Sequence, residues 1–267
     1  MLSEIKKISS LLLSVAFSSI GFIASITVTV LAAREVSSNP LFVGFPNAVG
    51  VGGAVLGTRM IYLISKNNSQ LNALAFTFLI GAFGGAIMFY SLIVDSFVLL
   101  LFGAFILGIG QSATLQTRYA ASFVASEKFK ATALSLAVWF SVFGSVFGPR
   151  MVGSYSNFFE NIFNSELIVG YVIALVGMLF AASSLFIFTS KKSILRSPSN
   201  LESELSNQNS NKKNGNLLSL LLVLNHFTMV VIMSATPLHI QDIGETVQLV
   251  GIIISYHTLG MFLFSPI

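Results

Sequence analysis

The chain has 267 residues, of which 54% are hydrophobic and only 9% are charged (14 Lys or Arg and 10 Asp or Glu). A soluble domain carries about 25% charged residues, so this composition excludes a soluble globular protein. The 25 Phe residues exclude a disordered chain, and the absence of Cys excludes disulfides, thiolate metal ligands and cysteine nucleophiles. The sequence therefore predicts an all-α integral membrane protein with several spans.

Apolar runs long enough to cross a bilayer recur along the whole chain. A spanning helix needs about 20 apolar residues, whereas a barrel strand would alternate at period two. The runs are continuous, and they predict eight helices: 10–33, 41–64, 71–94, 97–124, 131–155, 166–189, 217–238 and 246–267. The first run follows Lys6 and Lys7, as a signal peptide would, but it is too long for one. We expect it to be retained as the first helix.

The distribution of Lys and Arg predicts the orientation. With the N-terminus in the cytoplasm, 12 of the 14 basic residues fall in inner segments, and only Arg34 and Arg150 fall outside. This is the bias expected of cytoplasmic loops. The basic net charge of +4 thus indicates topology, and it does not indicate a nucleic-acid partner.

One polar segment divides the chain. Residues 190–216 are rich in Ser and Asn and nearly free of large apolar side chains, so we expect a flexible cytoplasmic linker. It separates a six-helix bundle (1–189) from the first two helices of a second bundle (217–267). The chain stops at Ile267 in an apolar run with no flanking charge, which predicts a fragment of a longer protein.

Two motifs carry a family resemblance. The fifth run contains Gly144, Gly148, Pro149 and Gly153, and the fourth contains a Gly-rich stretch that leads to Arg118. Glycines four residues apart allow two helices to approach closely, and proline bends a helix. Together with the six-helix layout and the basic loop, these motifs resemble the major facilitator superfamily of secondary transporters. The acidic residue that this family carries in the loop after its second helix is missing here.

The resemblance implies two six-helix halves that rock about a central site. It implies a cavity lined by helices one, two, four, five, seven and eight, with Gly144, Gly148 and Pro149 as a close-packed hinge. Its GxxxGP element favours an exporter driven by proton antiport.

Polar residues inside the spans are the candidate site. On the first helix, Ser14, Ser18, Gly21, Ser25 and Thr29 share a face that either lines a cavity or packs against a neighbour. On the fourth helix, Gln111, Thr114 and Arg118 share a face. A charge within a span costs about 2.5–3.5 kcal/mol and suggests function. Arg118 is also far enough along its helix to reach the cytoplasmic interface, where it would only snorkel.

Amides and imidazoles complete the set of candidates. Asn47 and Asn225 are polar residues in the second and seventh spans, and His226 and His257 lie in the seventh and eighth. Histidine titrates near neutrality, so these two are candidates for proton coupling, or they simply form hydrogen bonds between helices. The three histidines are too far apart in sequence for a metal site.

Motifs of enzymes are absent from the sequence, including GxSxG, HExxH and the P-loop, so we expect neither an enzyme nor a cofactor. The sequence predicts a secondary transporter of a small organic solute in a bacterial inner membrane, with lipid, solute and protons as its partners. The main rival is a membrane partner or sensor that keeps the fold without transporting.

Overall fold

The computed structural model describes residues 2–37, 39–188 and 212–263, and within these it contains eight α-helices and two short 3-10 helices but no strand. The predicted linker lies mostly outside the described residues, although α8 already begins at Lys212. The helices are α1 (Leu2–Val36), α2 (Phe45–Asn67), α3 (Gln70–Ile93), α4 (Phe97–Val124), α5 (Lys130–Phe163), α6 (Ile168–Phe188), α8 (Lys212–Asp242) and α9 (Val247–Phe262).

Seven of these helices are long and apolar enough to cross a membrane, while α9 is apolar but shorter within the described residues. Their order agrees with the predicted spans. The two largest differences from the predicted ends lie in α1 and α5. Helix α1 begins at Leu2, before the predicted residue 10, and α5 continues to Phe163, past residue 155. The extension of α5 ends at Asn164, which adopts a left-handed conformation (φ 58°) typical of a helix C-terminus.

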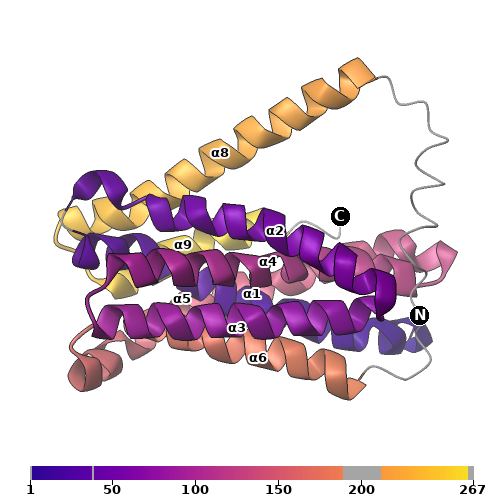
Figure 1. Ribbon diagram of the computed structural model, residues 1–267, viewed down its shortest axis with the longest axis horizontal. Coiled ribbons are helices and arrows are strands. Elements are labelled where there is room, and N and C mark those ends of the chain that lie inside the picture. Colours follow the sequence, from indigo (N-terminus) through magenta and orange to yellow (C-terminus); the bar gives the residue numbers. More distant parts are fainter. Residues whose placement is uncertain (1, 38, 189–211, 264–267) are drawn as a thin grey trace.

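Helix α1 is the central helix of the bundle formed by α1–α6. It packs against α4, α5 and α6. Helix α3 packs between α4 and α6, and α2 packs against α4. Most of α1 is buried, and most of its buried hydroxyl side chains hydrogen-bond to backbone carbonyls within the bundle, as Ser14 Oγ does to Ala181 O at 3.1 Å. This satisfies polar groups where water is absent. Figure 1 shows α1–α6 lying side by side.

Close helix contacts in the bundle are made at glycines. A Cβ atom at Gly81 of α3 would lie 2.7 Å from the Cα of Gly110 on α4, and one at Gly177 of α6 would lie 2.7 Å from the Phe17 carbonyl oxygen of α1. Real Cβ contacts are longer, so only glycine allows these backbones to approach so closely. Small residues therefore hold the bundle together where lipid offers no hydrophobic driving force.

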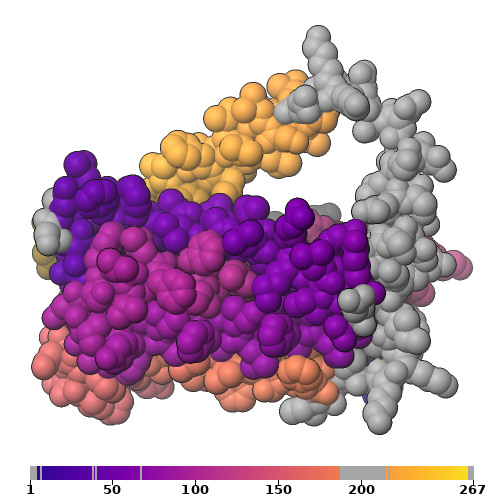
Figure 2. Space-filling model, in the orientation of Figure 1, coloured from indigo at the N-terminus to yellow at the C-terminus, as the bar shows by residue number. Residues whose placement is uncertain are grey.

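Helix α8 joins the bundle at one end only. All residues described from Leu217 to Thr228 are exposed, Met229 and Val230 are half-buried, and Pro237 and Ile240 are buried. Figures 1 and 2 show α8 leaning away from α2 toward its N-terminal end. We call the end of the molecule at the C-terminus of α8 the outer end, following the charge-based orientation, and the opposite end the inner end.

Candidate functional site

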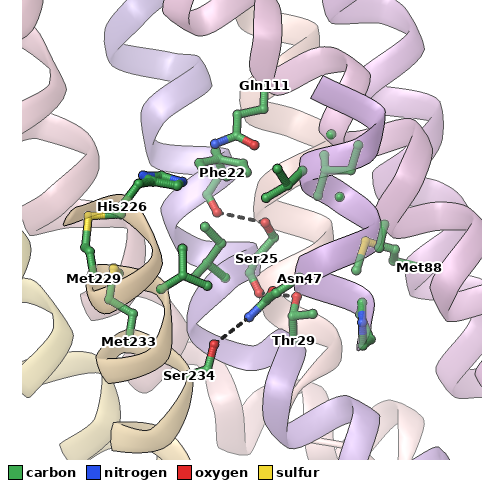
Figure 3. Close-up of a pocket in the computed structure, with 18 residues that line it drawn as sticks. Phe22, Ser25, Thr29, Asn47, Met88, Gln111, His226, Met229, Met233 and Ser234 are labelled. Atoms are coloured by element: carbon green, nitrogen blue, oxygen red, sulfur yellow. Dashed lines mark hydrogen bonds between the residues drawn. The ribbon is translucent and has the colours of Figure 1, made fainter. Parts of the chain in front are cut away.

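A cavity of about 110 Å³ lies where α8 meets the six-helix bundle. Its walls come from α1, α2, α4 and α8, with Met88 contributed by α3 (Figure 3). Its lining contains no Asp, Glu, Lys or Arg among the residues that the structure describes. Because its walls come from both the bundle and α8, the cavity lies between the two parts of the chain that the linker separates. This is where the sequence predicts a site.

The α1 wall uses the predicted polar stripe. Ser25 and Thr29 line the cavity, and each donates its hydroxyl proton to a carbonyl of its own helix. Ser25 Oγ lies 2.7 Å from the Phe22 carbonyl oxygen, and Thr29 Oγ1 lies 2.7 Å from the Ser25 carbonyl oxygen. With their protons engaged, these hydroxyls offer a ligand only acceptor lone pairs. Ser14 and Ser18, on the same stripe, are buried away from this cavity.

The cavity is bounded on its outer side by a hydrogen bond between the two parts of the chain. The Asn47 amide Nδ2 of α2 donates to Ser234 Oγ of α8 at 3.0 Å, and Figure 3 shows this pair at one edge of the pocket. Both residues are half-buried, and the bond joins α2 to α8. Opening the outer end requires that it break.

Gln111 of α4 and His226 of α8 form the other polar region of the cavity. Their side chains lie near Phe22 in Figure 3. Neither side chain has a hydrogen-bond partner among the described residues. An amide has two donor hydrogens and an acceptor oxygen, and a neutral imidazole has one donor and one acceptor. These two side chains are therefore available to a ligand, in contrast to the hydroxyls of α1.

Closer to the outer end, an ion pair links α1 to α8. Arg34 Nη1 lies 2.6 Å from Asp242 Oδ1 and donates to Gln241 Oε1 at 3.3 Å. The two charged side chains are 46% and 54% exposed. An ion pair this exposed contributes about 0–1 kcal/mol, so it closes the outer end without locking it.

Besides Ser25 and Thr29, the structure brings three of the predicted site residues to the cavity and separates the rest. Asn47, Gln111 and His226 line the cavity. Thr114 is buried in α4 outside the lining, and its Oγ1 has no hydrogen-bond partner among the described residues. Asn225 and His257 are exposed and do not line the cavity.

Arg118 is farther toward the inner end of α4. Its Nε is buried without a hydrogen-bond partner in the described part of the chain, and its guanidinium carbon lies 5.5 Å from the centre of the Phe262 ring of α9. A cation over an aromatic ring is attracted to the ring face. Arg118 thus contacts the second part of the chain, as a gating residue would, but it does not face the cavity.

The predicted hinge lies between α1 and α9. Gly144 and Gly148 face α1, where Cβ atoms would come within 2.5 Å of the Ser19 carbonyl carbon and 2.8 Å of the Ile20 carbonyl oxygen. Pro149 and Gly153 contact α9 instead, and a Cβ at Gly251 would overlap the Pro149 carbonyl oxygen. The glycines provide close packing on both sides of α5; their role as a hinge stays a prediction.

Three contributors to the site were not found from the sequence. Met229 and Met233 look like ordinary lipid-facing residues in an apolar run, and Ser234 is one hydroxyl among many. A period of 3–4 residues from His226 would have placed all three on or near its face of α8. The Arg34–Asp242 pair carries no local signal, since its two members are 208 residues apart.

Comparison with known proteins gives two curated relatives from Bacillus subtilis (strain 168). An "Uncharacterized MFS-type transporter YdeG" is 27% identical over 263 residues, which cover 95% of this chain and 61% of the relative. An "Uncharacterized MFS-type transporter YddS" is 28% identical over 273 residues, which cover 98% of this chain and 63% of the relative. The chain thus spans about three fifths of the length of these relatives. No protein-family model and no solved structure matches the sequence.

Proposed function

From the similarity to MFS-type transporters, which confirms the resemblance predicted from the motifs, we propose that this all-α membrane protein acts in secondary active transport. It moves a small organic solute by alternating access. The observation that carries the proposal is the cavity between the bundle and α8, where side-chain contacts join α8 to the bundle toward the outer end while α8 is exposed toward the inner end. Both curated relatives are described as transporters and not as enzymes, in agreement with the absence of enzymatic motifs.

The burial of α8 supports an inward-facing state. On the outer side of the cavity, Asn47–Ser234 and then Arg34–Asp242 join α8 to the bundle. On the inner side, the residues of α8 from Leu217 to Thr228 are exposed, so no described helix blocks the way from the cavity to that end. A solute would enter or leave the cavity from the cytoplasm in this state.

The contacts at the outer end are suited to a reversible gate. The exposed ion pair and one hydrogen bond, each contributing about 0–1.5 kcal/mol, give a small barrier that the binding of a solute can overcome. The close packing of α9 on Pro149 and Gly153 offers a pivot at which the second part of the chain can rock on α5.

We further propose export coupled to proton antiport, with the N-terminus in the cytoplasm of a bacterial inner membrane. His226 is the one titratable side chain that lines the cavity among the described residues, and no carboxylate or basic group of α1, α2 or α4 faces it there. Proton binding would place a charge in an otherwise uncharged cavity, which gives the two protonation states different affinities for a solute.

The test is solute-dependent proton movement in proteoliposomes. The purified protein is reconstituted with a pH-sensitive dye inside the vesicles, an acid interior is imposed, and organic solutes are added outside. The proposal expects proton efflux on addition of a solute, and loss of that efflux in H226F but not in H239F, whose imidazole is exposed and lies outside the cavity. Solute movement at a rate that does not depend on the pH gradient would contradict the coupling to protons. No movement of any solute in any direction would favour the membrane partner or sensor.

A further inference from the structure

We infer that the cavity accepts organic molecules that are uncharged, flat and about the size of a substituted benzene ring. This inference rests on the proposed function, because it treats the cavity as the solute site. It goes further by giving the chemical class of the solute and the residues that select it.

The charge of the cavity walls is the first property that selects a solute. The described residues that line the cavity include no ionised side chain, and the nearest ion pair, Arg34–Asp242, is internally neutralised. Burying an isolated charge without a partner costs several kcal/mol or more. A carboxylate or a quaternary ammonium would meet no counter-ion on these walls, so a neutral molecule is favoured.

The hydrogen-bonding groups of the cavity that have no partner in the fold are the second such property. The hydroxyl protons of Ser25 and Thr29 are donated within α1, and one amide hydrogen of Asn47 is donated to Ser234, so these donor hydrogens are already used. Gln111 and His226 retain both donor and acceptor capacity. A solute with one group that both donates and accepts, such as an amide, would satisfy them. A hydrocarbon would leave the half-buried Gln111 amide unpaired, at a cost of up to about 1–3 kcal/mol.

The apolar side chains and the volume of the cavity are the third such property. Figure 3 shows Phe22 beside Gln111, with Met229 and Met233 on the facing helix. Thioether sulfur and an aromatic ring both favour contact with the edge or face of a flat aromatic body. A volume of about 110 Å³ is comparable with the roughly 150 Å³ of a cavity that binds benzene, and the cavity is also accessible from its inner end, so it has room for one substituted ring. Benzamide, with its ring and amide, matches this size and chemistry.

The test compares three probes of similar size and different charge: benzamide, benzoate and phenyltrimethylammonium. Binding to the protein in lipid nanodiscs is measured by saturation-transfer NMR, with protein-free nanodiscs as the blank. The inference expects benzamide to bind at least tenfold more tightly than either ion. Q111L and H226F should each weaken benzamide three- to tenfold. Q116L is the matched control, because Gln116 is an amide on the same helix outside the cavity, and it should bind as the parent does.

Two results would overturn the inference. Equal or tighter binding of benzoate or phenyltrimethylammonium, weakened by Q111L, would show that the cavity selects a charged solute. Benzamide binding that is absent, or unchanged in both Q111L and H226F, would show that these side chains do not select the solute. If Q111L fails to fold, H226F still tests the inference. His226 is exposed, so its replacement disturbs the packing of the protein least. Proton-coupled solute movement in vesicles is measured separately, so the transport proposal can stand when this inference fails.

Discussion

Gly144→Ala tests the close packing of α5 on the central helix α1. A Cβ atom built at Gly144 lies 2.5 Å from both the carbonyl carbon and the Cβ of Ser19. Cβ atoms essentially never approach another heavy atom within 3.0 Å, so the two helices must separate by at least about 0.5 Å. Because the obstacle is mainly backbone, no rotamer change can relieve it.

The matched control is Gly52→Ala on α2. A Cβ at Gly52 has no heavy atom within 4 Å, so this variant gains only the helix preference of alanine over glycine, about 0.5–1 kcal/mol. Gly144→Ala has the same gain and adds an overpacking cost of about 1–3 kcal/mol. The difference between the two variants therefore isolates the packing cost, about 1–3 kcal/mol in favour of Gly52→Ala.

Thermal unfolding in detergent, followed by circular dichroism at 222 nm, measures the difference. We expect Gly52→Ala to unfold at or above the parent temperature and Gly144→Ala to unfold several degrees below Gly52→Ala. Equal unfolding temperatures for the two variants would refute the reasoning, because α5 would then not pack on α1 through glycine.

Three further predictions address the gate, the loop before α6 and the contact with α9. Arg34→Ala removes an exposed ion pair worth at most about 1 kcal/mol, so labelling of Ser25→Cys by an impermeant maleimide added outside should rise by no more than about fivefold; a larger rise would contradict a weak gate. Burial and the neighbouring Glu160 raise the pKa of Glu166. An acid with a raised pKa in the folded state destabilises it as pH rises, so Glu166→Gln should raise the unfolding temperature at pH 7 and do so less at pH 4; a constant difference would contradict this. Gly251→Ala should be less stable than Gly260→Ala, since only the Cβ at Gly251 overlaps backbone; equal stability in the same unfolding assay would contradict the α5–α9 contact.

The sequence predicts the number and order of the membrane helices well, because each is a run of apolar residues of bilayer length. It fails where a helix leaves that pattern. Helix α5 continues past residue 155 through Ser156, Asn157 and Glu160, polar residues that end the apolar run without breaking the helix, since no Gly or Pro follows Gly153 before Phe163.

The cavity residues were predicted in part, for a geometric reason. Gln111 and Arg118 lie seven residues apart, so they share a face of α4 but are separated by about 10.5 Å along its axis. Sequence periodicity finds the shared face and cannot find the depth, so it groups Arg118 with the cavity that only Gln111 reaches. Contacts such as Asn47 to Ser234 depend on how α8 packs, which no local pattern encodes.

Reversible cross-linking of the outer end tests alternating access most directly. The sequence contains no Cys, so Arg34→Cys and Asp242→Cys introduce the only two thiols in these 267 residues. A short bis-methanethiosulfonate linker joins them, and gradient-driven solute movement is measured in proteoliposomes before cross-linking, after it, and after reduction. We expect the cross-link to stop the movement of the solute and reduction of the linker to restore it. Movement at an unchanged rate in the cross-linked protein would contradict alternating access through this gate.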